Sequence, residues 1–247
     1  MIDTKVSILI KFLRFPLMIM VIMIHAHVTE ISMGGVTYDF DLHDFPLYNN
    51  ISYCISDIVC RIAVPIFYIF SGYLFYINIQ DYTVKEYVQK IRKRTKTLIV
   101  PYFFWNLAVI FFFFLAQTLM PSFTSGVNKL VVDYSFYDWI RCFWDSHNGM
   151  PICYQLWFIR DLFVVVLLSF VIYYAIKKCK FYYLLSLGLL YLVGVDFRIN
   201  GLSVVAIFFF SIGALFSIYK YDFIEFLKRF KTINYIISLL STKNVDG

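Results

Sequence analysis

An arginine and a histidine stand eleven residues apart in the first apolar segment of the chain, at Arg14 and His25. On an α-helix this spacing is within about 20° of three full turns, so both side chains share one face, about 16 Å apart along the axis. Histidine has an ordinary pKa of about 6.5 and can take a proton from a hydroxyl and return it near neutral pH. The spacing therefore predicts that both side chains lie on the face of the helix that is turned toward the other helices. Side chains placed there are suited to acid–base chemistry. The alternative is an arginine that extends to the lipid headgroups and a histidine that is satisfied by a neighbouring helix.

Three more ionisable residues, Arg61, Arg160 and Asp161, interrupt apolar segments. Charges inside a membrane are costly, and they are candidates for function for that reason. Neighbouring side chains on a helix point about 100° apart, so we expect Arg160 and Asp161 to meet partners on another helix or a loop rather than each other. A helix-packing ion pair is the alternative. Close packing explains Pro65 and the pair Ser71-Gly72 in the second apolar segment, but it does not explain Arg61.

A basic cluster runs from Lys90 to Lys96 and contains Arg92 and Arg94. Such a cluster is either an orientation signal beside anionic lipid or a site for a phosphorylated ligand, because arginine and lysine suit phosphates. The five cysteines and four histidines show no spacing that is typical of metal ligands, so no metal site is predicted.

The elements that hold these residues are predicted to be membrane helices. Hydrophobic residues make up 61% of the 247 residues and charged residues only 15%, whereas soluble domains carry roughly a quarter charged residues. A spanning helix needs about 20 apolar residues, and about six segments qualify. These are 8–28, 58–78, 98–119, 156–176, 181–195 and 202–219, with 233–240 as the start of a seventh. We therefore predict an all-α, polytopic transmembrane bundle that forms a single domain over residues 1–247.

Charge placement predicts the orientation. Basic residues collect in the predicted linker 81–97, after the fourth span at 177–180 and after the sixth at 220–231, whereas the loops 29–57 and 120–155 carry mostly acids. By the positive-inside rule the N-terminus is cytoplasmic and those two loops lie outside, as in a multi-pass protein of the inner (cytoplasmic) membrane. The net charge of +6 follows from the basic loops, so no nucleic-acid partner is expected.

Four separate segments, taken in order, resemble the membrane acyltransferase-3 family. They are LRF at 13–15 with VIMIH at 21–25, VPIFYIFSGYLF at 64–75, KRTKTLIVPY at 93–102 and LWFIRDL at 156–162, with a weaker fifth, FFSIGA, at 209–214. The resemblance covers about residues 8–219. Family members usually have more spans and a longer chain, so the C-terminal helices of the family are expected to be missing from a truncated product.

The resemblance implies a membrane-bound O-acyltransferase that moves an acyl group, typically acetyl, from a CoA donor to a hydroxyl of an extracytoplasmic glycan or another envelope molecule. Acyl-CoA, the acceptor glycan and membrane lipid are then the partners, and no cofactor is bound permanently. The implied catalytic residues are His25, as general base or transient acyl carrier, and Arg14. Arg92, Arg94 and Lys96 would bind the donor. The residues implied to position the acceptor are Arg160, Asp161, Arg61 and Trp157.

The alternative function is a non-enzymatic membrane protein, either a glycan or lipid transporter or an inactive truncated remnant. Transporters commonly carry broken helices in corresponding halves. Only the span around Pro65 shows such a break, with no matching second half. Transfer is therefore favoured over transport.

The predicted orientation can be tested with reporter fusions. A reporter inserted within 81–97 should read as cytoplasmic, and one inserted within 120–155 should read as external, because basic loops stay inside. The opposite result at both sites would overturn the whole arrangement.

Overall fold

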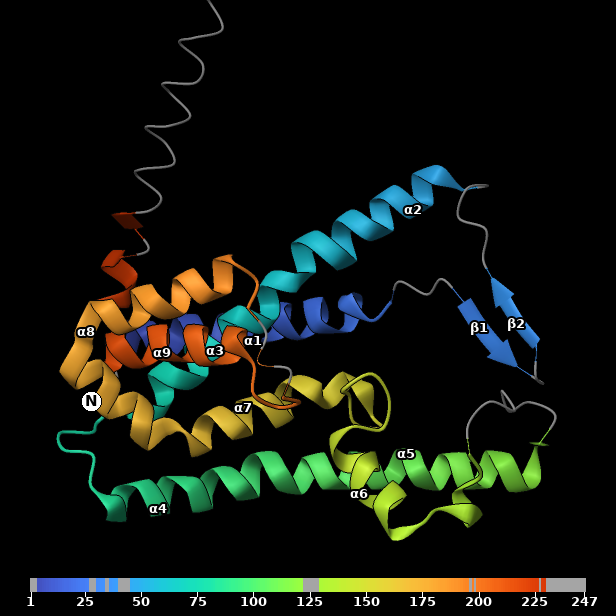
Figure 1. Cartoon of the computed structure of the whole chain (residues 1–247). Coiled ribbons are helices and arrows are strands. Elements are labelled where there is room, and N and C mark those ends of the chain that lie inside the picture. The colour runs from blue at the N-terminus through green and yellow to red at the C-terminus, as the bar shows by residue number, and fades with distance from the viewer. Residues whose placement is uncertain are drawn as a thin grey trace, which may run out of the picture.

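The computed structural model describes residues 4–26, 30–33, 36–39, 45–121, 129–195, 197, 199–226 and 228–229. Within these residues the chain folds as a bundle of helices with one small antiparallel hairpin (Figure 1). The hairpin pairs β1 (Glu30–Met33) with β2 (Val36–Asp39) in the loop after the first helix, and sequence reasoning did not predict it. The prediction of an all-α transmembrane bundle is confirmed.

Three long helices begin the fold. The first is α1 (Thr4–Ile24). The second runs from Pro46 to Tyr76 and comprises α2 (Pro46–Tyr53), a π-helical stretch (Cys54–Val59), a 3-10 stretch (Cys60–Ile62) and α3 (Ala63–Tyr76). The third runs from Val84 to Leu119 and comprises α4 (Val84–Arg94), a π-helical stretch (Thr95–Ile99) and α5 (Val100–Leu119).

Four further helices complete the described bundle: α6 (Phe136–Trp144), α7 (Trp157–Leu167), α8 (Ser169–Leu192) and α9 (Val204–Ile218). The 3-10 stretch Cys60–Ile62 lies just ahead of Pro65, and the π-helical stretch Thr95–Ile99 lies just ahead of Pro101. A proline lacks the backbone N–H and its ring crowds the carbonyl four residues earlier, so the preceding turns depart from α-helical geometry.

The spans differ from the sequence prediction in number. Among the described residues, three helices are long and apolar enough to cross a membrane, or four if the pair α7–α8 counts as one bent span. The predicted spans 156–176 and 181–195 fall on this pair, which bends by 61° at Leu168 and leaves helical geometry again at Lys180. The sixth span corresponds to α9, which has only 15 residues. The predicted linker 81–97 is mostly helix α4, and 233–240 lies outside the described residues.

The closest helix crossing joins α3 to α9 through two glycines. A Cβ added at Gly72 would lie 2.0 Å from the carbonyl oxygen of Phe210, and one added at Gly213 would lie 1.9 Å from that of Ile69. Backbone therefore meets backbone in both directions, as small residues allow in membrane helices. The main hydrophobic core, which includes Tyr68 and Phe210, forms around this crossing.

Polar groups at the break between α7 and α8 form hydrogen bonds with three tyrosines. The hydroxyl of Tyr76 donates to the Ser169 carbonyl, that of Tyr87 donates to the Leu167 carbonyl at 2.9 Å, and that of Tyr82 lies 3.0 Å from the Ser169 hydroxyl. A bend inside an apolar bundle exposes carbonyls that lipid cannot satisfy, so these phenols permit the break.

Four basic side chains lie at one end of the bundle, which we call the basic end. They are Lys90, Arg94, Lys177 and Lys220. A cavity of about 610 Å³ there is lined by Val6 of α1 and by the residues that end α3 and α9. The ammonium of Lys177 lies 5.8 Å from the ring of Tyr219, just after α9, and Lys90 donates to the Phe75 carbonyl near the end of α3. His25 follows the other end of α1.

The glycine crossing predicts that Gly72→Ala destabilises the bundle. The added methyl meets a carbonyl oxygen that cannot turn away, and overpacking of this kind costs about 1–3 kcal/mol of unfolding free energy. Unfolding of the purified protein in detergent measures this loss.

Gly188→Ala on α8 is the matched control, because its Cβ would lie 3.4 Å from the Phe208 ring, an ordinary contact. The control should lose nothing, since alanine favours a helix over glycine by about 1 kcal/mol. Equal losses in the two variants would contradict the proposed crossing.

Candidate functional site

Arg160 and Asp161 form a buried ion pair near the start of α7. Their side chains are only 7% and 6% exposed, and Nε and Nη2 of Arg160 donate to Oδ1 of Asp161 at 3.0 and 2.9 Å. The expectation that these neighbours would not pair directly is therefore wrong. The Cβ directions do diverge, but the arginine side chain is long and flexible enough to bring its planar guanidinium back to the next carboxylate.

The loop after α6 supplies the other partners of Arg160, which decides between the two alternatives, another helix or a loop, that the sequence left open. Nη1 of Arg160 donates to the carbonyl oxygens of Trp144 and Gly149, the latter at 2.7 Å, and the guanidinium lies 5.5 Å from the centre of the Trp144 ring. Gly149 takes a positive φ of 77°, and its N–H donates to the Asp145 carboxylate at 2.9 Å. One buried cation thus holds the loop against the start of α7.

A capping box stabilises the N-terminus of α6, the helix that leads into this loop. The Ser135 hydroxyl accepts from the N–H of Asp138, and Asp138 accepts in return from the N–H of Ser135 at 2.8 Å. Lys129 donates to the same carboxylate at 2.6 Å. The Lys129 ammonium, together with the Ser135 hydroxyl and N–H, holds the pKa of Asp138 well below its ordinary value. The carboxylate therefore stays ionised, and the cap persists, throughout the neutral range.

The ion pair also lines a cavity of about 420 Å³. The opposite wall is the segment that joins α8 to α9, with Gly194, Asn200 and Ser203 among its residues. A guanidinium, a carboxylate and an amide together present donors and acceptors to a ligand with several hydroxyl groups. The volume lies within the usual range of small-molecule sites.

His25 lies beside the segment that leads into α7. It directly follows α1, is half-buried, and meets the ring of Tyr154 edge to face at 5.1 Å between centroids. Tyr154 opens the 3-10 turn Tyr154–Leu156, which runs straight into α7. The structure therefore brings His25 to the segment that carries Arg160 and Asp161, although His25 is not among the described residues that line the 420 Å³ cavity.

The prediction that Arg14 faces the bundle is wrong. The buried side of α1 carries Val6, Ile10 and Leu17, whereas Arg14 is exposed. Apolar residues at three- and four-residue spacing decide which stripe of a helix turns inward. Arg14 lies at the margin of that stripe, so only His25 of the predicted pair enters the bundle.

Arg61 and Trp157 lie elsewhere. Arg61 is 67% exposed and pairs with Asp57, one turn earlier, at 2.7 Å. This surface ion pair explains the arginine that helix packing left unexplained. Trp157 is half-buried and packs against the main core at the start of α7. Neither residue is among the described residues that line the three cavities.

The basic cluster divides into two groups. The Arg94 guanidinium lies 5.9 Å from the centre of the Phe75 ring, and the Lys90 ammonium lies 5.2 Å from it. Lys90 also donates to the Phe75 carbonyl near the C-terminal end of α3, where a cation is favoured. Arg92 and Lys96 are exposed instead. Half of the cluster therefore holds α4 against α3, and the other half faces outward.

Asn106 and Tyr102 were missed by sequence reasoning. Asn106 is fully buried, and its amide donates to the Tyr102 carbonyl at 2.8 Å and accepts from the N–H of Cys153 at 3.0 Å. The Tyr102 hydroxyl donates to the Phe143 carbonyl at 2.5 Å. Tyr102 therefore fastens α5 to the end of α6, and Asn106 fastens α5 to the loop that follows α6. The sequence signal was a lone asparagine in an apolar run, and no comparable signal marked Tyr154.

A family model described as an acyltransferase domain matches residues 8–241. No curated protein and no solved structure matches the chain at a significant level.

Replacing Arg160 should be far more damaging than replacing Arg61. Arg160→Gln leaves Asp161 buried without its guanidinium, and removal of one partner of a buried pair costs about 3–5 kcal/mol. Arg61→Gln breaks an exposed pair that contributes about 0–1 kcal/mol. Unfolding in detergent measures both losses. Hydrogen exchange of the 145–150 amides should accelerate only in Arg160→Gln, and similar behaviour of the two variants would show that Arg160 does not hold the loop.

Proposed function

The chain belongs to the acyltransferase-3 family of membrane acyltransferases, and on that premise we propose that it transfers an acyl group, acetyl in the simplest case, from acyl-CoA to a hydroxyl of an extracytoplasmic glycan or another envelope molecule. The observation that carries the proposal is the position of His25 beside Tyr154, at the start of the segment whose Arg160–Asp161 pair lines a polar cavity. A base and a hydroxyl-binding wall thus lie on adjoining elements.

The proposed reaction needs a base and an anion-stabilising group. The acceptor hydroxyl oxygen attacks the thioester carbonyl carbon while His25 takes the hydroxyl proton. The carbon–oxygen bond forms, the carbon–sulfur bond breaks, and the CoA thiolate leaves with the proton that His25 returns. Positive groups that face the tetrahedral oxyanion lower the barrier. Arg14 is exposed on α1 and lies about 16 Å from His25 along the helix axis, so its part in this proposal is to bind and align the CoA donor on its way to His25.

The acceptor site is proposed to be the 420 Å³ cavity. Asp161 accepts hydrogen bonds from sugar hydroxyls and Arg160 donates to sugar oxygens, while the Asn200 amide does both. Arg61 and Trp157 would contribute only to the approach of a larger acceptor, because neither is among the described residues that line the cavity.

The donor is proposed to bind at the basic end. Arg92 and Lys96 are exposed there, and clustered cations suit the phosphates of CoA. Arg94 stacks on Phe75 and would set the position of the cluster while remaining near the phosphates. The positive-inside rule assigns this end to the cytoplasm, where acyl-CoA is made, and assigns the cavity to the other side.

His25→Asn should abolish most transfer without preventing insertion. Asparagine keeps the polarity and approximate size of histidine but cannot accept a proton at neutral pH, and the loss of a general base typically costs about 10²–10⁴-fold in rate. The measurement is transfer of radiolabelled acetyl from acetyl-CoA to envelope glycans, in membranes that hold matched amounts of each variant.

Two histidines provide controls, since His27→Asn and His147→Asn should both retain most of the activity. His27 lies outside the described residues, and His147 lies in the loop after α6. Full turnover in His25→Asn would refute the proposed mechanism, and equal losses in all three variants would point to general damage to the fold.

A further inference from the structure

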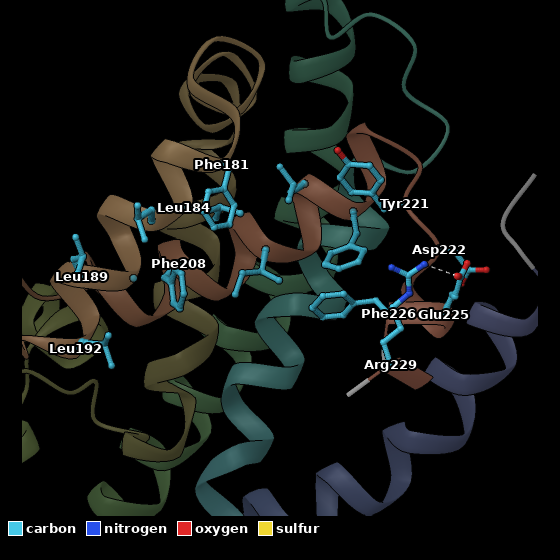
Figure 2. A pocket seen from close by; sticks show the side chains of 15 residues that line it. Phe181, Leu184, Leu189, Leu192, Phe208, Tyr221, Asp222, Glu225, Phe226 and Arg229 are labelled. Carbon is cyan, nitrogen blue, oxygen red and sulfur yellow. Dashed lines mark hydrogen bonds and ion pairs between the residues drawn. The ribbon is translucent and has the colours of Figure 1, made fainter. Parts of the chain in front are cut away.

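An apolar groove of about 700 Å³ runs along the surface between the second half of α8, α9 and the segment 221–229 (Figure 2). Its walls include Leu185 and Leu189 of α8 and Phe208 and Ile212 of α9. Gly188 widens it, because a Cβ at that position would meet the Phe208 ring at 3.4 Å. The groove is separate from the cavity beside Arg160 and Asp161.

The length of the groove matches one leaflet of a bilayer. From Phe181 to Leu192, two of its lining residues, α8 rises about 16 Å at 1.5 Å per residue. The hydrocarbon core of a bilayer is about 30 Å thick, so this length is close to half of it. An occupant with one extended hydrocarbon chain fits this length, whereas a helix that spans the hydrocarbon core would extend well beyond it.

One end of the groove carries charge. Tyr221, Asp222, Glu225 and Arg229 line it just after α9, at the basic end, and Figure 2 shows them grouped beside Phe226. Asp222 accepts from the N–H groups of Ile224 and Glu225 at 2.8 and 2.9 Å, which fixes the turn. Glu225 pairs with Arg229 at 2.8 Å, and both side chains are largely exposed.

These charges complement a zwitterion. Two carboxylates attract an ammonium, and the neighbouring guanidinium and phenol donate to a phosphate. An anionic headgroup would meet two like charges and one opposite charge among these lining residues. A headgroup without an amine would leave Glu225 paired with Arg229 and would gain no contact from the carboxylates. A headgroup that carries a phosphate and an ammonium side by side can contact the two carboxylates, the guanidinium and the phenol.

We propose that this groove is a binding site for one phospholipid with an amine headgroup, taken from the leaflet at the basic end. One acyl chain lies along α8 and α9, the ammonium rests between Asp222 and Glu225, and Arg229 contacts the phosphate. The same two helices carry the segment that lines the cavity beside Arg160 and Asp161. The acyl chain would therefore lie along the two helices that hold one wall of that cavity.

Photocrosslinking in vesicles of defined composition tests the proposal. The full chain, with p-benzoylphenylalanine at Leu189, is reconstituted into equal parts of phosphatidylethanolamine and phosphatidylglycerol, and the adducts are identified by mass spectrometry. The control site is Leu107 on α5, which is 48% exposed against 55% for Leu189 and lies outside the three cavities. Adducts at Leu189 should favour the amine lipid about two- to fivefold over those at Leu107, the range that one exposed ion pair provides.

Glu225→Gln should return the Leu189 ratio to that of Leu107 while leaving the yield of lipid adducts unchanged, since the apolar walls are intact. Equal ratios at the two sites in the unaltered chain would overturn the choice of headgroup. Adducts at Leu189 to residues 230–247 or to a second copy of the chain, in place of lipid, would overturn the proposal itself. None of these readouts depends on acyl transfer, so the result stands apart from the function proposed for His25.

Discussion

The contact between the backbones of α3 and α9 at Gly72 and Gly213 is the constraint on which the other contacts depend. In lipid, helices gain little from burying apolar side chains against one another, so association rests on close packing and on polar contacts. Two glycines that face each other allow both. Because α3 and α9 are far apart in the sequence, their crossing brings the end of the second long helix and α9 into one core.

Several features follow from this crossing. It places Tyr76 near the end of α3, where its hydroxyl reaches the Ser169 carbonyl and satisfies the break between α7 and α8. It also leaves the Phe75 carbonyl for Lys90, so that the basic helix α4 is held against the bundle. The bent pair α7–α8 and the polar helix α4 are both costly in an apolar environment. Each is tolerated because its polar groups form hydrogen bonds with α3 or with the segment that follows α3.

At the opposite end, the buried Arg160 guanidinium organises the site. An arginine with only a neighbouring carboxylate would leave donors unsatisfied, and the carbonyls of Trp144 and Gly149 supply the remaining acceptors. The loop after α6 therefore folds over α7, and Asn106 fastens the same loop to α5. The polar wall of the cavity is a consequence of satisfying one buried charge, which is why binding chemistry and stability coincide in this part of the molecule.

The sequence by itself determined the membrane class, the all-α bundle, the family and the close contact at Gly72, because composition, apolar runs and small residues act locally. It also indicated that Arg160 would meet another helix or a loop, and the structure decided for the loop after α6. Only the tertiary structure decided that Arg160 reaches back to Asp161, that Arg14 stays outside the buried stripe and that Asp57 neutralises Arg61. Those outcomes depend on how a long side chain bends and on which stripe of a helix the neighbouring helices cover. Residue spacing specifies an angle around one helix axis, and it carries no information about the groups that another segment of the chain brings to that face.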